Sequence, residues 1–280
     1  MKVKLASDYG FCYGVKQSIA KAEANRGSVI VGGEIIHNPE ETSRLKQDFN
    51  IGIENDPNNI KKGQTAIIRA HGIPEQVEQQ LRERGVVLID ATCPNVKDVQ
   101  LRVKELSTKG YQIILLGDKA HPETQGIMGY TQNGIIVVKD SSELDALIPK
   151  LTGDIAMLSQ TTKNFNTLQG ISKWVNDRIT PDVKNCVLCN TICPATALKQ
   201  KSAQDLAGQV DVGVVVGGKN SSNTKLLKDI MGEFCPTYLV ERPGELDLSW
   251  FKGKKICGLT SGSSTPDYSI QSVKREIEAI

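Results

Sequence analysis

Residues 86 to 106, VVLIDATCPNVKDVQLRVKEL, contain the unit from which the fold can be predicted. VVLID is a short run of apolar and β-branched residues, which is typical of a strand buried on both faces. The amphipathic segment after it predicts a helix over 95–109. Cys93 lies between the two, directly before the helix. The stretch therefore predicts a strand, a thiol and a helix in succession.

The same alternation of strand-like and helix-like segments runs along the whole chain. Strand-like runs are KVKLAS, SVIVGGEII, TAIIRA, VVLID, QIILLG, GIIVV, DIAML, VDVGVVVGG and KICGLT. Helix-like segments cover residues 14–25, 75–84, 95–109, 164–178, 196–208 and 222–231. Apolar strands that alternate with helices predict an α/β fold with mostly parallel sheets.

Composition excludes several classes of protein. The chain carries 34 basic and 32 acidic residues, a net charge of +2, so neither nucleic acid nor an acidic membrane surface is an expected partner. No apolar run approaches the roughly 20 residues of a membrane span, and the N-terminus lacks the apolar segment of a signal peptide. We therefore expect a cytoplasmic protein. Its seven cysteines, an odd number, favour thiolate chemistry or metal binding over disulfides.

Three cysteines share one setting, directly before a helix-like segment: Cys12, Cys93 and Cys193. CYGVK and CPNVK both have lysine four residues after the cysteine, and CPATALK has it later, a faint repeat that suggests three similar α/β lobes. A helix N-terminus favours a thiolate, and three converging thiolates would form a metal site with one open position. Each thiol taken alone could equally be a packing residue, but the shared setting favours ligands.

A local alternative lies in CVLCNTICP, which places Cys186, Cys189 and Cys193 at C-x2-C-x3-C-P spacing. This spacing echoes part of a ferredoxin run, lacks one of its cysteines, and could hold zinc or a cluster by itself. The spacing does not decide between the two sets. Cys235 and Cys257 are interpreted as packing residues.

Each of the three histidines follows a strand-like run: His37 in GEIIHNPE, His71 in IIRAHGIPE and His121 in GDKAHPETQG. Because ligands of open α/β sheets collect at the carboxyl ends of strands, we expect the imidazoles to share an anion site. Glu123 lies in the loop of His121 and could donate or relay a proton there. A carboxylate in such a loop is otherwise more often a surface group.

Loops rich in hydroxyls and amides follow strand-like runs in the second half: LSQTTKN, GGKNSSNTK and TSGSSTPDYS. Such loops expose donors that bind phosphate, and the run SSNT at 221–224 exceeds what a helix cap requires. No G-x-G-x-x-G or P-loop pattern supports a nucleotide cofactor. A thiolate centre, an anion site and an acid predict a reductase of a small phosphorylated molecule. The alternatives are a metal-binding module with a regulatory role and a cofactor-free phosphate enzyme whose cysteines only pack.

The motifs resemble those of the 4-hydroxy-3-methylbut-2-enyl diphosphate reductase family, which acts last in the non-mevalonate isoprenoid pathway. They run in the family's order from residue 10 to residue 267: GFCYGV, GEIIHNP, RAHGIP, DATCP, HPETQG, SQTT, NTICPAT, NSSNT and SGSSTPD. Ordered motifs along nearly the whole chain are far more specific than any single one.

The resemblance implies a [4Fe–4S] cluster held by Cys12, Cys93 and Cys193, with the fourth iron open to the substrate hydroxyl. It also implies three α/β lobes arranged as a trefoil around the cluster. The expected lobes are 1–95 with the first two cysteines, 96–193 ending at the third, and 194–280 with the diphosphate-binding loops.

The resemblance also implies the roles of other side chains. Glu123 corresponds to the proton-relay carboxylate and Thr161 to the hydroxyl that orients the substrate alcohol. The implied substrate-binding residues are His37, His71, His121, Thr161, Ser221, Ser222, Asn223 and Ser264.

The implied reaction is a reductive dehydroxylation with two electrons and two protons, which yields isopentenyl or dimethylallyl diphosphate. The chain has no flavin or NAD signature, so we expect an external donor such as ferredoxin or flavodoxin. Cys186 and Cys189 are not in the family's ligand set, and they leave open a different cluster arrangement or an oxidation-sensitive pair.

Overall fold

The chain divides into two units in a computed structural model, which describes residues 1–144 and 151–280. Unit 1 consists of Met1–Lys16, Ile36–Asp48 and Pro194–Ile280, and unit 2 of Gln17–Ile35 and Phe49–Cys193. Unit 1 contains one parallel sheet and the described part of unit 2 contains two, and each unit has its own buried core.

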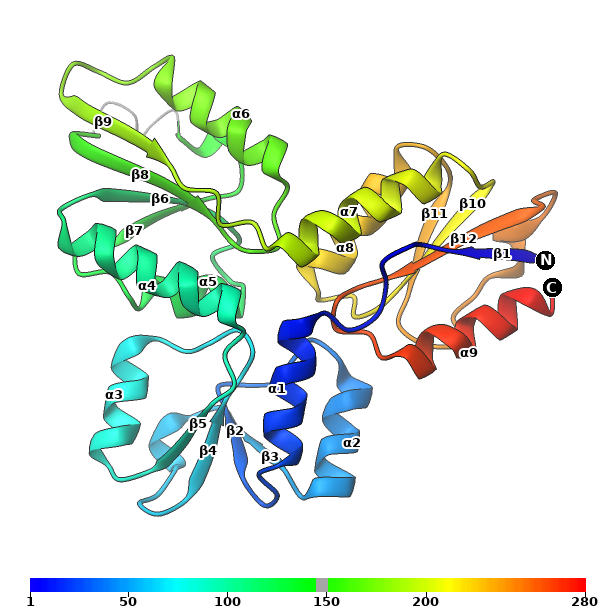
Figure 1. Cartoon of the computed structure of the whole chain (residues 1–280), viewed down its shortest axis with the longest axis horizontal. Coiled ribbons are helices and arrows are strands. Elements are labelled where there is room, and N and C mark those ends of the chain that lie inside the picture. Colours follow the sequence, from blue (N-terminus) through cyan, green and yellow to red (C-terminus); the bar gives the residue numbers. More distant parts are fainter. Residues whose placement is uncertain (145–150) are drawn as a thin grey trace. The chain divides into compact units, whose positions relative to one another are not determined.

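Unit 1 contains one parallel sheet in the order β1-β12-β10-β11 (Figure 1). Its strands are β1 (Lys2–Leu5), β10 (Val212–Val216), β11 (Thr237–Val240) and β12 (Ile256–Ser261). Its helical segments are α2 (Pro39–Phe49), α7 (Pro194–Ala207), α8 (Ser222–Gly232), η4 (Leu248–Phe251) and α9 (Asp267–Glu278). Val214 packs with α9 and Val215 packs with α7 and α8, so successive residues of β10 are buried on opposite faces.

Unit 2 contains two parallel sheets among its described residues, in the orders β3-β2-β4-β5 and β7-β6-β8-β9. The strands of the first are β2 (Val29–Val31), β3 (Gly52–Glu54), β4 (Thr65–Ile68) and β5 (Val87–Asp90). Those of the second are β6 (Gln112–Leu116), β7 (Ile135–Val138), β8 (Gly153–Ser159) and β9 (Val183–Leu188). The helical segments are η1 (Pro57–Asn59), α3 (Glu75–Glu83), α4 (Pro94–Thr108), α5 (Pro122–Met128), η2 (Ser141–Leu144) and α6 (Phe165–Asn176). The helix α1 (Tyr13–Glu23) crosses the division between the units along the sequence.

Helices cover both faces of the β7-β6-β8-β9 sheet (Figure 1). Ile114 packs with Leu168 of α6 on one face, while Ile113 packs with Val103 of α4 and Ile127 of α5 on the other. Burial on both faces is the reason that QIILL is apolar throughout.

The predicted fold class is confirmed, because the described residues form three similar four-stranded parallel sheets with helices between the strands. The strands that the pattern failed to predict are β3, β9 and β11, each at an edge of its sheet. Edge strands are buried less and need fewer apolar residues. The unpredicted helices are α2, α5 and α9; α5 spans only seven residues, and PEETSRLKQDF of α2 is mostly polar. The lobe boundaries at 95/96 and 193/194 stay a prediction.

Among the described helices, none combines the length and the apolar character that crossing a membrane requires.

Candidate functional site

The predicted site residues of unit 2 follow the carboxyl ends of strands. His71 follows β4 and Cys93 follows β5 of one sheet, while His121 follows β6 and Thr161 follows β8 of the other. Because the strands of each sheet are parallel and neighbouring, each pair of loops emerges from one edge of its sheet. The topology thus places these polar residues where ligands of α/β sheets bind.

Glu123 is a buried carboxyl group in the first turn of α5, and both of its oxygens accept hydrogen bonds from Thr161. The backbone N–H of Thr161 donates to Oε1 at 2.6 Å and its hydroxyl donates to Oε2 at 2.9 Å. Burial raises the pKa of Glu123 to about 7, because desolvation penalises the carboxylate; the bonds from Thr161 and the charge of Lys163 act in the opposite direction. Glu123 therefore holds a proton at pH values where an ordinary glutamate has lost it.

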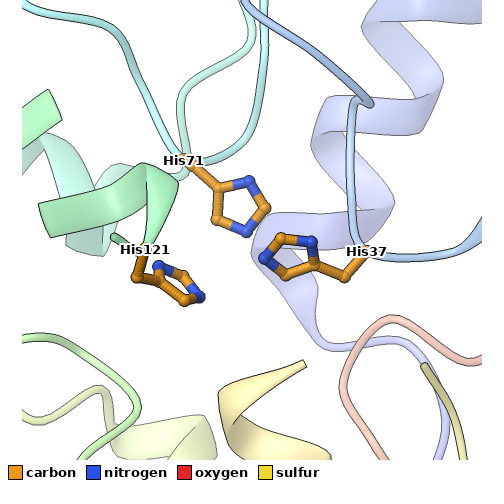
Figure 2. Close-up of side chains that lie close together, drawn as sticks. All are labelled: His37, His71 and His121. Carbon is orange, nitrogen blue, oxygen red and sulfur yellow. The ribbon is translucent and has the colours of Figure 1, made fainter. Parts of the chain in front are cut away.

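His71 and His121 lie edge to face, with ring centroids 5.5 Å apart and ring planes at 82° (Figure 2). His121 caps the N-terminus of α5, where its Nδ1 accepts a hydrogen bond from the backbone N–H of Glu123 at 3.2 Å. A neutral imidazole that accepts at Nδ1 carries its proton on Nε2. His121 is thereby set to donate a hydrogen bond from Nε2. His37, also drawn in Figure 2, belongs to unit 1.

The place of α5 depends on the glycine at its C-terminal end. A Cβ on Gly129 would lie 2.6 Å from Cα of Pro74 and closer still to its Cβ. Because the Cα and Cβ of Pro74 belong to a rigid ring, α5, the helix that carries Glu123, would have to move. We expect Gly129→Ala to lower the free energy of unfolding by about 1–3 kcal/mol in urea denaturation.

The control for this substitution is Gly170→Ala, within α6, where an added Cβ meets nothing within 4 Å. Alanine there should raise the free energy of unfolding by up to about 1 kcal/mol, since it is the better helix former. If Gly129→Ala also raised the free energy of unfolding, α5 would not be tightly packed against Pro74.

A hydrogen bond connects the two cysteine loops of unit 2. Cys93 is the N-cap of α4, and its backbone N–H donates to Ala70 O at 2.9 Å. Cys193 donates from its backbone N–H to Thr161 O at 3.0 Å. Asn95 Nδ2 donates to Cys193 Sγ at 3.2 Å. The structure therefore brings Cys193 together with Thr161 and with the helix start that follows Cys93.

The state of the thiols fits metal ligation. Cys12, Cys93 and Cys193 are all half-buried, and none of the seven cysteines, all of which lie in the described residues, is in a disulfide. The side chain of Cys93 caps no backbone N–H of its helix. Thiolates are the soft donors that iron–sulfur clusters bind, and a helix start favours the thiolate form.

Cys186 and Cys189 lie on opposite faces of their sheet. Cys186 packs beside the cluster of Ile114 and Cys189 beside that of Ile113. A spacing of three along an extended strand turns the two side chains away from each other. Burial also raises the pKa of the Cys186 thiol, which disfavours the thiolate. In this arrangement the local CVLC pair does not offer two sulfur atoms to one ion.

In unit 1, the loop after β12 connects the segments of Cys12 and His37. The backbone N–H of Cys12 donates to Ser263 O at 3.3 Å. The hydroxyl of Ser264 donates to His37 O at 3.1 Å, and Asn38 Nδ2 donates to Ser264 O at 2.8 Å. The SGSSTPD motif thus positions two other predicted site segments of the same unit.

The N-terminus of α8 carries the SSNT run. Ser221 is its N-cap and accepts from Thr224 N–H at 3.3 Å, while Asn223 Nδ2 donates to Ser263 Oγ at 3.3 Å. Ser222 is the first residue of the helix. Asn223 Oδ1 and Thr224 Oγ1 are buried, with no hydrogen-bond partner among the described residues. Buried polar atoms beside the N-terminus of an 11-residue helix fit a site for an anionic ligand.

Two residues that make these contacts, Asn95 and Ser263, were not predicted from the sequence. Both lie inside or directly beside quoted motifs, Asn95 two residues after Cys93 and Ser263 next to Ser264. A polar side chain at the position two after a cysteine ligand was the available signal for Asn95.

Comparison with protein families finds a match to the family described as LytB protein over residues 3–278. A relative from Helicobacter pylori (strain Shi470), named 4-hydroxy-3-methylbut-2-enyl diphosphate reductase, is 47% identical over 281 residues, which covers 100% of both chains.

Two solved structures are also similar. One is described as (E)-4-hydroxy-3-methyl-but-2-enyl diphosphate reductase, the terminal enzyme of the non-mevalonate pathway; it has 39% identity, a TM-score of 0.70 and 100% coverage of both chains. The other, described as the E-1-hydroxy-2-methyl-but-2-enyl-4-diphosphate reductase from Plasmodium falciparum, has 26% identity and a TM-score of 0.90, and covers 98% of this chain and 87% of that one.

Proposed function

The chain belongs to the LytB family, and on that premise we propose that it reduces 4-hydroxy-3-methylbut-2-enyl diphosphate to isopentenyl and dimethylallyl diphosphate. In this reaction the C–O bond of the alcohol breaks and a C–H bond forms. Two electrons and two protons are consumed, and the oxygen leaves as water.

We propose that Cys12, Cys93 and Cys193 hold the cofactor, a [4Fe–4S] cluster. When bound, the cluster supplies electrons and an open iron that acts as a Lewis acid toward the alcohol oxygen. The support from this chain is the matching chemistry of the three thiols, which are half-buried, in no disulfide and directly before helices.

The diphosphate would be bound first at the start of α8. Ser221, Ser222 and Asn223 lie at the start of α8, where the helix N-terminus favours negative charge. Ser264 is next to Ser263, whose Oγ accepts the hydrogen bond from Asn223 Nδ2. The remaining proposed contacts come from the three histidines, His37, His71 and His121.

Glu123 and Thr161 would deliver the proton to the leaving oxygen. The hydroxyl of Thr161, 2.9 Å from Oε2, can donate to the alcohol oxygen and be resupplied by the protonated Glu123. We rest the proposal chiefly on this buried acid, whose pKa of about 7 keeps it protonated where the reaction needs a proton donor.

The electron donor would be a small external redox protein, ferredoxin or flavodoxin, and the reaction would take place in the cytoplasm. Neither nucleic acid nor a membrane is needed as a partner. The near-balanced charge of the chain is consistent with this.

The direct test is anaerobic turnover. Cluster-loaded protein, given the diphosphate substrate and a chemical reductant, should form both isoprenoid diphosphates, measured by mass spectrometry, and form neither when the reductant is left out. Absence of product from protein of confirmed iron and sulfide content would overturn the proposed function.

A further inference from the structure

We propose that Asn95 is a positioning residue that raises the reduction potential of the cluster by donating a hydrogen bond to the Cys193 thiolate. The proposal rests on the proposed function, since it requires that Cys193 is a cluster ligand. It assigns a role to a side chain that touches neither the substrate nor the iron.

The hydrogen bond joins two positions that the backbone holds in place. Asn95 is the second residue of α4, behind Pro94 at the first, and the helix start is tied down by the bond from Cys93 N–H to Ala70 O. Cys193 is held by its own bond to Thr161 O. The 3.2 Å distance from Asn95 Nδ2 to Cys193 Sγ therefore joins two anchored segments that are 98 residues apart in sequence.

The helix itself does not need this side chain. The N-cap of α4 is Cys93, and Asn95 lies exposed two positions beyond it, past the place where an asparagine side chain would cap. The end of the amide that faces sulfur is set by charge, because a thiolate attracts the N–H groups and repels the carbonyl oxygen.

The three cysteine motifs differ at this position. The residue two after the cysteine is Gly14 in CYG, Asn95 in CPN and Ala195 in CPA. Among them, only Asn95 has a side chain that can donate a hydrogen bond.

The direction of the effect follows from charge. Reduction adds negative charge to the cluster and its sulfur ligands, so an N–H dipole that points at one of them stabilises the reduced state more than the oxidised state. Loss of the donor should make the cluster harder to reduce. A carboxylate in its place should have a larger effect in the same direction, because it adds repulsion.

The test compares Asn95→Leu and Asn95→Asp with the matched control Asn166→Asp. Asn166 is also an exposed asparagine at the second position of a helix, α6, so both aspartates have the same favourable relation to a helix dipole. The reconstituted proteins would be analysed for iron and sulfide, for apo-protein melting temperature, and for midpoint potential by a redox titration followed by electron paramagnetic resonance.

We expect all variants to bind the cluster. At a fixed solution potential, the reduced-to-oxidised ratio should fall by about threefold for Asn95→Leu and by about tenfold for Asn95→Asp, where tenfold corresponds to 59 mV for one electron. Asn166→Asp should not shift it.

Two results would overturn the inference. Equal potentials in the Asn95 variants and the control would show that the hydrogen bond does not act on the cluster. Loss of iron from both Asn95 variants, at an unchanged melting temperature, would make Asn95 necessary for binding rather than for the potential. Failure of the wild type and every variant to bind a cluster would instead show that the proposed function is wrong, and the inference would fall with it.

Discussion

Cys93→Ser is expected to remove the chromophore of the proposed iron–sulfur cluster and to lower turnover by roughly a thousandfold or more. A serine oxygen is a harder and less acidic donor than a thiolate, so it does not replace a soft cluster ligand. Loss of the several kcal/mol that a Lewis-acid centre provides accounts for the size of the effect. Iron content, the absorbance near ~400 nm and anaerobic turnover measure it.

The same substitution should leave the fold intact. Cys93 occupies the N-cap of α4, and serine is a preferred N-cap residue. The apo-protein of Cys93→Ser should therefore be as stable as the wild type, or more stable by up to about 1 kcal/mol. Thermal unfolding of the apo-proteins separates a lost ligand from a failed fold.

Cys186→Ser provides the matched control, because Cys186 lies half-buried within β9, on the sheet face that Cys189 does not share. The Cys186→Ser variant should keep the absorbance near ~400 nm and the turnover of the wild type. If Cys186→Ser lost the cluster while Cys93→Ser kept it, the ligands would be the local set that ends at Cys193.

Glu123→Gln is expected to lower kcat by roughly 10²–10⁴-fold, the usual contribution of a general acid. Glutamine keeps the shape of the side chain, accepts from the backbone N–H of Thr161 and donates to its hydroxyl, but it has no proton to give. KM should change less than kcat, because the proposed function has Glu123 act on the reacting oxygen rather than on the diphosphate. Steady-state turnover with a chemical reductant measures both.

The pH dependence follows from the raised pKa of Glu123. Wild-type turnover should fall as the pH rises above about 7, since the acid is then deprotonated, and Glu123→Gln should lack this decline. Glu83→Gln, an exposed glutamate on α3, should behave as the wild type.

The free energy of unfolding should also depend on the protonation of Glu123. The pKa of Glu123 lies near its ordinary value of 4.5 in the unfolded chain and near 7 in the folded protein. The stability that its protonated form contributes is therefore complete below pH 4.5 and is lost as the pH rises through 7. At pH 8 the glutamine variant should be more stable than the wild type by on the order of 3 kcal/mol, a difference that vanishes at low pH. If the difference in free energy of unfolding between the two proteins were the same at every pH in that range, burial would not set the pKa of Glu123.

The sequence alone was sufficient to predict the parallel α/β class and to place Cys93, His71 and His121 after strands of the sheets. These features are local: apolar runs of β-branched residues form buried strands, amphipathic segments form helices, and what lies between them must be loop. Cys93 and His121 could thus be placed at loop positions without coordinates. The edge strand β9 could not be predicted, because VKNCVL carries a weaker version of the same pattern.

Only the tertiary structure decided how these loops act on one another. That Glu123 is buried and paired with Thr161, 38 residues away, depends on which loops the folded sheet brings together. The contact of Asn95 with Cys193 has the same origin. Desolvation and directional hydrogen bonds are set by packing between distant segments, and the local pattern of residues contains no record of that packing.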